Sequence, residues 1–414
     1  MPFDAWRELE PSAAARAVHQ RVAGLPALLR SAALAWLKPE SALGEELSGA
    51  PLGAPLGGIP YFLKDLFDVA GVPTHAGSAF LGTARPVTGD CQIVRQLRTA
   101  GAALAGKTHL VEFAAGLTGE NRNYGDCPHP HRADRLAGGS SSGSAALVAA
   151  GVVPLSIGTD TGGSVRVPAS FCGLFGYRGT PGDEWVRDAF PLSPTCDTAG
   201  WFTAGAADMR ETLAALVSPP GGSKSEPRGV FLRANDLLAG SPVDAACARA
   251  AAEFSAPADT DTRDALLAAW QGAVDAYSTV VMSEAHIIHR TWLTTHRSAY
   301  DPAIWQRFSD AGNFEPEKVT AARKVFSGVQ ENFTQFFRTH DFLVLPGAPL
   351  PALTKAQCTA ETRRAILTFS APASLGRRPV LTVPVPLEDG LTAGLQIIVR
   401  DPASPVLDWV LRKF

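Results

Sequence analysis

The sequence GTDTGGSVRVP occupies residues 158–168, directly after the β-rich apolar run VVPLSI at 152–157. A second small-residue loop, AGGSSSGS at 137–144, precedes that run and leads into a short helical segment at 144–150. Gly/Ser-rich loops are usually flexible linkers, and that interpretation is the alternative here. Linkers, however, would not lie between apolar segments inside a predicted core. The two loops therefore indicate a structured site near the centre of the fold.

Helices and strands alternate on both sides of these loops. A helix predicted at 91–100 is followed by a small apolar strand at 102–105, and the segments 144–150 and 152–157 repeat that order. Three later strand candidates return the chain to a sheet: 342–345, 380–385 and 394–399. Such alternation is typical of a sheet with helices packed on each side. We therefore predict an α/β fold with a large mixed β-sheet core covered by helices on both faces.

The same patterns predict a single domain over residues 1–414, without internal repeats. Residues 1–40 are rich in Ala and Leu and are expected to form one or two helices. The parts predicted along the chain are an N-terminal helical cover (1–45), the core (50–210), a surface linker (217–228), a helical insertion (243–340) and a return to the sheet (341–414).

Composition limits the classes of function. With a formal net charge of −3 and dispersed Lys and Arg residues, the chain has no basic field for phosphate backbones, so we expect no nucleic-acid partner. No apolar run approaches the ~18 residues that a membrane span needs, and the N-terminus lacks a signal-peptide pattern. The six cysteines form no CxxC pair and read as reduced, buried thiols. We expect a cytoplasmic protein that binds neither nucleic acid nor membrane.

The segment TGGS at 161–164 has the features of an oxyanion hole followed by a nucleophile. Glycines let several backbone N–H groups turn toward one point without interference from side chains. A serine at the end of this loop, Ser164, could attack a carbonyl carbon bound there if a base removes its proton. The sequence must therefore supply that base elsewhere.

Histidine is the commonest base, but none of the nine histidines stands in a recognisable triad context. Lys64 is the other candidate, because it follows the apolar run IPYFL at 59–63 and is expected to be partly buried. Burial disfavours the ammonium form and yields a neutral amine that can accept a proton near neutral pH. The alternative for Lys64 is a simple ion pair with the neighbouring Asp65.

Two other motifs are present but lack the structural context that they need. GAALAGKT at 101–108 satisfies the P-loop pattern, yet a helix precedes it and the strand lies inside it, the reverse of a phosphate-binding loop. GSSSG at 139–143 matches the nucleophile elbow of α/β-hydrolases, centred on Ser141. The preceding residues 132–136 are charged and not strand-like, and no convincing acid and histidine follow in order.

Several separate stretches together resemble the amidase signature family. Residues 50–210 resemble it strongly and the remainder loosely. The quoted segments are GIPYFLKD (58–65), GAALAGKT (101–108), EFA (112–114), GGSS (138–141), GTDTGGSVR (158–166), PASFCGLFG (168–176), SPTCDTAG (193–200), VLP (344–346), LTVP (381–384) and GLQ (394–396).

This resemblance implies a Ser–Ser–Lys triad, with Ser164 as the nucleophile, Ser140 as the proton relay and Lys64 as the general base. It also implies a cis peptide bond between Gly139 and Ser140, which is rare for a residue other than proline. The oxyanion hole would consist of the backbone N–H groups of Thr161, Gly162, Gly163 and Ser164. The expected supporting residues are Gly139, Ser141, Asp160 and Arg166.

The implied activity is that of an amidase, which hydrolyses a carbon–nitrogen bond other than a peptide bond through an acyl-enzyme. No metal or organic cofactor is expected. The alternatives are hydrolysis of a carbamate, urea-type or ester bond at the same site, or an amidotransferase component that works in a multi-protein complex. A small-molecule amide is the expected partner, and a homodimer is compatible with the sequence.

The substrate pocket is predicted from residues 118–124, 185–190 and 292–305, with Thr118, Tyr124 and Tyr177 as contacts. YRGT at 177–180 replaces the lysine-proline pair that is usual in the family. The middle region after Leu216 is also short. Both departures lie near predicted pocket elements and leave the identity of the substrate open.

Overall fold

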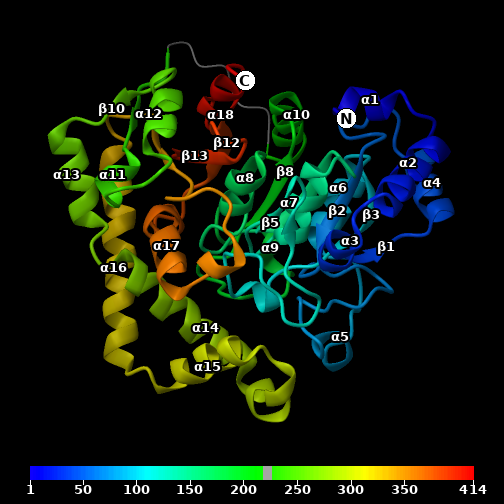
Figure 1. Ribbon diagram of the computed structural model, residues 1–414, viewed down its shortest axis with the longest axis horizontal. Coiled ribbons are helices and arrows are strands. Elements are labelled where there is room, and N and C mark those ends of the chain that lie inside the picture. Colours follow the sequence, from blue (N-terminus) through cyan, green and yellow to red (C-terminus); the bar gives the residue numbers. More distant parts are fainter. Residues whose placement is uncertain (218–225) are drawn as a thin grey trace.

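The computed structural model describes residues 1–217 and 226–414, and most of the predicted linker at 217–228 lies outside them. An 11-stranded mixed sheet runs through the molecule, in the order β1-β3-β2-β6-β8-β7-β12-β13-β11-β9-β10 (Figure 1). Its strands are β1 (Leu34–Leu37), β2 (Pro60–Lys64), β3 (Ala103–Thr108), β6 (Leu155–Thr159), β7 (Phe175–Arg178), β8 (Ala199–Thr203), β9 (Gly229–Phe231), β10 (Ala256–Pro257), β11 (Phe342–Pro346), β12 (Val380–Pro386) and β13 (Thr392–Val399).

Helices connect and cover these strands. The bounds of the α-helices are α1 (Phe3–Arg7), α2 (Pro11–Ala23), α3 (Ala27–Ala33), α4 (Glu40–Ser48), α5 (Leu81–Ala84), α6 (Gln92–Thr99), α7 (Ser142–Ala149), α8 (Arg166–Cys172), α9 (Glu184–Arg187), α10 (Ala206–Leu216), α11 (Ala234–Leu237), α12 (Asp244–Ala252), α13 (Thr260–Ala269), α14 (Ala273–Thr295), α15 (Pro302–Asp310), α16 (Pro316–Phe336), α17 (Ala360–Leu375) and α18 (Val406–Leu411). Four short 3₁₀ helices add η1 (Glu112–Ala114), η2 (Arg297–Ala299), η3 (Ala311–Asn313) and η4 (Lys355–Gln357).

The two faces of the sheet are buried in different hydrophobic clusters, as β11 illustrates. Phe342 and Val344 belong to a cluster that includes residues of α2, α6, α12 and α18. The intervening Leu343 and Leu345 belong to a second cluster, built largely from α13 to α17. Successive side chains of a strand point to opposite faces. Helices therefore cover both faces, and the predicted α/β class with a mixed sheet is confirmed.

The N-terminal region is not the one or two helices predicted for residues 1–40. It contains three helices, and Leu34–Leu37 then form β1, which pairs antiparallel with β3 at an edge of the sheet. The Ala/Leu-rich sequence favours a helix locally, but pairing with an exposed strand edge overrides that preference. Pro39 also disfavours the helical conformation for the residue before it.

Residues 132–136, predicted not to be strand-like, form β5 (Arg132–Leu136), which pairs with β4 (Pro128–His129) in a separate two-stranded sheet. Charged residues are tolerated in this strand because its middle is exposed to solvent. This correction removes one reason for rejecting the nucleophile elbow at 139–143. The absence of a suitable acid and histidine remains.

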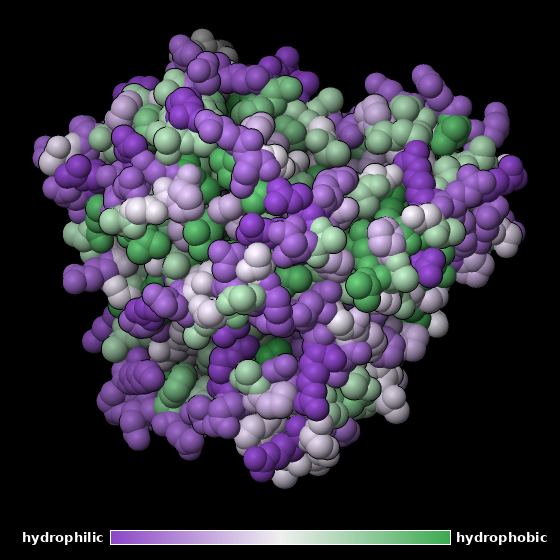
Figure 2. Space-filling model, viewed as in Figure 1, coloured by the Kyte–Doolittle hydropathy of each residue, from purple (hydrophilic) through white to green (hydrophobic). Residues whose placement is uncertain are grey.

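The region at 243–340 is mostly helical, as predicted, with short loops and the two-residue strand β10 between its helices, and β11, β12 and β13 return the chain to the sheet as expected. No helix among the described residues is long and apolar enough to cross a membrane. On the face drawn in Figure 2, hydrophilic residues cover most of the surface and hydrophobic ones appear only in small groups.

Candidate active site

Lys64 ends β2, between β3 and β6, and its side chain reaches a cluster of hydroxyl groups. Its Nζ lies 2.8 Å from Ser140 Oγ, 2.9 Å from Ser141 Oγ and 2.8 Å from Thr159 Oγ1. Because β2 and β6 pair in parallel, their carboxyl ends deliver Lys64 and Thr159 to the same edge of the sheet. Ser140 and Ser141 come from the Gly/Ser loop that leads into α7. The structure therefore brings together the lysine strand and both small-residue loops.

Lys64 is fully buried, and this changes its protonation. Burial lowers the pKa of Lys64 to about 7, although the nearby carboxylates of Asp160 and Asp197 oppose the shift. Its surroundings are hydroxyl and carbonyl groups rather than a directly paired carboxylate. A substantial fraction of Lys64 is therefore a neutral amine at neutral pH.

Asp65 does not pair with Lys64, contrary to the alternative considered above. Its Oδ1 lies 2.5 Å from the Nζ of Lys107, and both side chains are buried. Lys107 belongs to β3 and comes from the segment that matches the P-loop pattern. The lysine of this pattern therefore forms a buried ion pair next to the site. Helix α6 precedes strand β3, as predicted.

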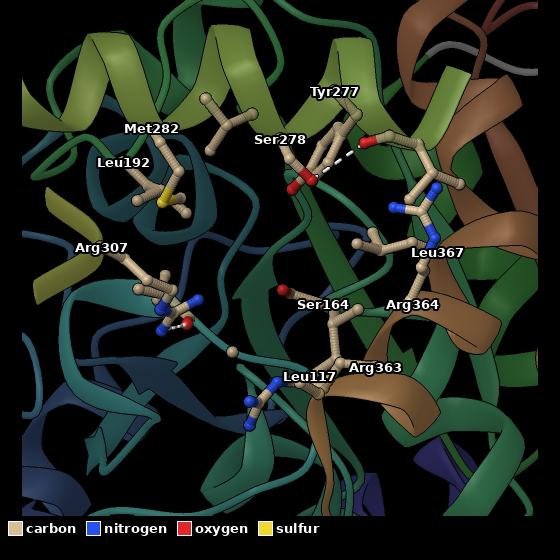
Figure 3. A pocket seen from close by; sticks show the side chains of 16 residues that line it. Leu117, Ser164, Leu192, Tyr277, Ser278, Met282, Arg307, Arg363, Arg364 and Leu367 are labelled. Carbon is tan, nitrogen blue, oxygen red and sulfur yellow. Dashed lines mark hydrogen bonds between the residues drawn. The ribbon is translucent and has the colours of Figure 1, made fainter. Parts of the chain in front are cut away.

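Ser164 lies in the loop between β6 and α8 and faces a cavity (Figure 3). The backbone N–H of Ser141 donates to the carbonyl oxygen of Ser164 at 3.2 Å, which ties the two loops to each other. The Gly139–Ser140 peptide bond is cis, as the resemblance implied. Ser140 and Lys64 are fully buried, and Ser164 is the one member of the predicted triad that lines this cavity.

The loop at 161–164 departs from the predicted oxyanion hole at one position. The N–H of Gly163 donates to Asp160 Oδ1 at 2.8 Å, so it is already occupied. Among the described residues, no hydrogen-bond acceptor takes the N–H groups of Thr161, Gly162 or Ser164. A Cβ at Gly162 would lie 2.2 Å from the hydroxyl of Tyr277, so only glycine fits there. Three of the four predicted donors are therefore available to an oxyanion.

The carboxylate of Asp160 holds this loop through hydrogen bonds from several backbone N–H groups. Besides Gly163, its carboxylate accepts hydrogen bonds from the N–H groups of Val165 and Arg166 at 3.0 and 3.2 Å. The guanidinium groups of Arg166 and Arg178 contact it at 2.9 and 2.8 Å. Burial alone would raise the pKa of Asp160, but these two cations hold it far below its usual value. Asp160 and Arg166 thus hold the loop between β6 and α8 through these hydrogen bonds and the ion pair between them.

Arg178 was not predicted as a site residue. It belongs to YRGT, the segment noted only as a departure from the family pattern, and it is fully buried. A basic residue that ends the strand after the signature was a usable signal, because a buried arginine needs a carboxylate partner. The structure shows that this partner is Asp160.

Asp197 is a second residue that the sequence reasoning missed, although it lies within the quoted SPTCDTAG segment. Its carboxylate accepts a hydrogen bond from the hydroxyl of Thr161 at 2.6 Å and from the N–H groups of Leu192 and Ser193 at 2.9 Å each. Burial raises its pKa to about 6. Asp197 therefore joins the oxyanion loop to the segment that carries Leu192 into the cavity wall.

We expect Asp160→Asn to lower the free energy of unfolding by about 3–5 kcal/mol, because it leaves two buried guanidinium groups without their anion. Urea unfolding followed by circular dichroism measures this change. Asp264→Asn is the matched control, since Asp264 is exposed and its contact with Arg263 lies at the surface. A loss below about 1 kcal/mol for Asp160→Asn would mean that the network contributes little to stability.

The cavity has a volume of about 310 Å³, within the range of small-molecule sites. Its walls come from the loop after η1, from α14, α15 and α17, and from Ser164 and Leu192 (Figure 3). The lining residues are Ala114, Ala115, Gly116, Leu117, Ser164, Leu192, Val274, Tyr277, Ser278, Val281, Met282, Arg307, Ala360, Arg363, Arg364 and Leu367.

None of the three predicted contacts lines this cavity. Thr118 is buried directly after the lining residue Leu117, and its hydroxyl donates to Glu120. Tyr124 stacks on His109 and donates to the carbonyl of Ser78. Tyr177 is fully buried and packs against Trp201 in the first hydrophobic cluster. The predicted segment 292–305 does belong to α14 and α15, but these helices line the cavity through other residues, and α17 was not predicted as part of the pocket.

Comparisons with known proteins agree with this geometry. A family model described as Amidase matches residues 12–402. The chain is 33% identical to AtzE, the 1-carboxybiuret hydrolase subunit of Pseudomonas sp. (strain ADP), over 83% of this chain and 80% of that protein. It is 31% identical to a glutamyl-tRNA(Gln) amidotransferase subunit of Salinispora arenicola, over 86% and 82%. A crystal structure of an amidase superposes with a TM-score of 0.85 at 30% identity, over all of both chains.

Proposed function

Because the chain belongs to the amidase signature family, whose members hydrolyse carbon–nitrogen bonds, we propose that it cleaves an amide-type bond through an acyl-enzyme on Ser164. Ser140 is the proton relay and Lys64 the general base. One observation carries this proposal: the amine of Lys64 lies 2.8 Å from Ser140 Oγ in a buried cluster, and the neighbouring Ser141 is hydrogen-bonded through its N–H to the carbonyl of Ser164, which faces the cavity.

The hydrogen bonds around Lys64 support a neutral amine that accepts from Ser140. The hydroxyl of Ser141 donates to the carbonyl of Thr159 at 3.1 Å, so toward Lys64 it acts as an acceptor. A neutral amine has two N–H bonds and one lone pair, and Ser141 and Thr159 Oγ1 take the two N–H bonds. The lone pair is then left for the hydroxyl hydrogen of Ser140. Among the described residues Lys64 is the hydrogen-bond partner of Ser140 Oγ, and Ser164 Oγ makes no such bond. The proposed relay therefore requires the two serine hydroxyls to approach each other, so that Ser140 accepts the proton of Ser164 as that residue attacks the carbonyl carbon.

The rest of the reaction returns the proton and stabilises charge. Attack by Ser164 Oγ places negative charge on the carbonyl oxygen, which the N–H groups of Thr161, Gly162 and Ser164 hold. Removing one such donor typically costs about 10²–10³-fold in rate. The proton passes back from Lys64 through Ser140 to the leaving nitrogen, and the carbon–nitrogen bond breaks. Water then attacks the acyl-enzyme, activated by the same relay, and releases the acid.

Two related functions use the same residues. Carbamate, urea-type and ester bonds present a comparable carbonyl carbon to Ser164. The similarity to a glutamyl-tRNA(Gln) amidotransferase subunit supports a second candidate, in which the chain works only with other subunits. Co-purification of such subunits from the native source, together with inactivity of the isolated chain, would favour that candidate.

A hydrolysis screen of the purified chain tests the proposal. We expect release of ammonia or amine from at least one class among simple amides, ureas and carbamates, with a matched ester in each series. Ser164→Ala measured in parallel separates catalysis by this site from contaminating activity. Equal product release by the native protein and the Ser164→Ala variant would contradict the proposal.

A further inference from the structure

Three arginines line the cavity that Ser164 faces: Arg307 from α15, and Arg363 and Arg364 from α17 (Figure 3). No aspartate or glutamate is among the described residues that line it. Most of the other walls are apolar, including Leu117, Leu192 and Leu367. The cavity therefore concentrates positive charge in a largely apolar space, and the partners of each guanidinium decide how much of that charge is free.

Arg364 is already neutralised. Its two terminal nitrogens lie 2.5 and 3.0 Å from the two carboxylate oxygens of Asp275, in a bidentate pair. Its side chain is also 60% exposed, so it faces solvent as much as the cavity. Arg364 therefore contributes little to the electrostatic potential inside the cavity.

Arg363 is only weakly paired. Its nearest carboxylate oxygen is Glu120 Oε2, 3.8 Å away, which is beyond hydrogen-bond distance. The carboxylate of Glu120 already accepts from Lys355 at 2.6 Å and from Thr118 at 2.8 Å. Much of the charge on Arg363 is therefore left for another anion.

Arg307 has no carboxylate partner among the described residues. It donates only to main-chain carbonyl oxygens, those of Ala115 at 2.6 Å and Ala303 at 3.3 Å. Burial and the neighbouring charge of Arg363 lower its pKa, although the more distant carboxylate of Asp301, which does not contact Arg307, opposes the shift. A partly desolvated guanidinium held by carbonyl groups beside another guanidinium is unfavourable unless an anion accompanies it.

We infer that this cavity binds an amide whose own structure carries a carboxylate, which Arg307 and Arg363 hold while Ser164 attacks the amide carbonyl. The inference rests on the proposed function and names its substrate class. A guanidinium presents two parallel N–H donors that match a carboxylate. The volume of about 310 Å³ admits a small molecule of this kind. The main-chain bond to Ala115 fixes Arg307 in the wall that runs to Leu117.

Matched substrate pairs test the inference. Malonamate, succinamate and glutaramate each carry one amide and one carboxylate, and malonamide, succinamide and glutaramide replace that carboxylate with a neutral group of the same shape. N-acetylglycine and N-acetylglycinamide place the same difference on the amine side. We expect kcat/KM to be at least about tenfold higher for the charged member of one pair, mainly through a lower KM. A native enzyme that hydrolyses the neutral members equally well or better overturns the inference.

Two substitutions show whether Arg307 is the source of this preference. We expect Arg307→Gln to reduce the ratio of kcat/KM for the charged and neutral members by about tenfold or more, and Arg307→Lys to restore part of it. The ratio is insensitive to a general loss of folded protein. Arg364→Gln, in the same cavity but already paired with Asp275, retains the preference. Equal ratios in the native protein and Arg307→Gln would contradict the assignment to Arg307.

A binding measurement keeps the inference separate from the proposed reaction. Isothermal titration calorimetry of the Ser164→Ala variant with succinamate, glutaramate and N-acetylglycine needs no turnover. We expect at least one of them to bind about tenfold more tightly than its neutral counterpart, and the added Arg307→Gln substitution to remove that difference. Hydrolysis of neutral amides without any preference for anions would leave the proposed function standing and refute this inference. Preferential binding of the charged compounds without hydrolysis of any of them would support the carboxylate site formed by Arg307 and Arg363 and contradict the proposed function.

Discussion

Ser164→Ala is expected to lower kcat by on the order of 10⁵-fold or more while the protein remains folded. Ser164 supplies the hydroxyl that faces the cavity from the end of the oxyanion loop, and an alanine there cannot form the acyl-enzyme. Its side chain contributes no hydrogen bond to another described residue, so its loss should leave the packing nearly unchanged. Steady-state hydrolysis of the best substrate from the screen measures the effect.

Ser170→Ala is the matched control for this loss. Ser170 is equally buried, but its hydroxyl donates to the carbonyl of Arg166 within α8 and does not reach the cavity. We expect its kcat to stay within about threefold of the native value. Intact mass spectrometry of the native protein quenched during turnover should show an added acyl mass that Ser164→Ala lacks. A variant at Ser164 that kept near-native turnover would assign the nucleophile to another residue.

The separate parts of the site around Lys64 could be predicted because each part is a local sequence pattern. Two features are unusual in their local sequence context: a charged residue at the end of an apolar strand, and serines in glycine-rich loops. Each one therefore indicates a functional residue. The alternation of helices and strands places such loops at one edge of a sheet. The fold class and the candidates Lys64 and Ser164 could therefore be predicted from local patterns, whereas the meeting of Lys64 with Ser140 was implied only by the resemblance to the amidase signature family.

The cavity could not be predicted in the same way. Tyr277, Arg307 and Arg363 come from three helices that are distant from the signature in sequence, and their amphipathic patterns are those of ordinary surface helices. Aromatic residues attracted attention instead, but Tyr177 and Tyr124 pack in the interior or against other rings. Which side of a helix faces a cavity depends on tertiary packing, which a single sequence does not encode locally.

Competition for hydrogen bonds also lies beyond sequence reasoning. Gly163 has the flexibility that an oxyanion donor needs, but the carboxylate of Asp160 takes its N–H. The same carboxylate recruits Arg178, whose position looked like a departure near the substrate pocket. Only the three-dimensional arrangement shows that both residues belong to one network.

The activity should depend on pH through the protonation of Lys64. The base acts in its neutral form, and burial lowers the pKa of Lys64 to about 7. Below that value, kcat/KM on a substrate that does not itself titrate is expected to fall about tenfold for each pH unit, and above it to reach a plateau. Initial rates between pH 5 and 9 at constant ionic strength measure this profile. A rate independent of pH across 5 to 7 would exclude Lys64 as the base.

Lys64→Met should remove both the catalysis and the protonation that depend on this amine. We expect a rate loss of about 10³-fold or more, together with loss of the inflection near pH 7, because methionine fills a similar volume but accepts no proton.

The folded-state pKa of Lys64 lies below its unfolded value, so the unfolded chain binds more protons between about pH 7 and 10.5. Lys64 therefore lowers the free energy of unfolding most below pH 7. As the pH rises above 7, the free energy of unfolding of the native protein increases relative to that of Lys64→Met by up to about 1.4 kcal/mol per pH unit. Urea unfolding of both proteins at pH 7 and at pH 9 measures that difference, because the other titratable groups contribute equally to both proteins. A difference that stayed constant between the two pH values would mean that Lys64 keeps an ordinary pKa in the folded state, and a relay through Ser140 would then lack its base.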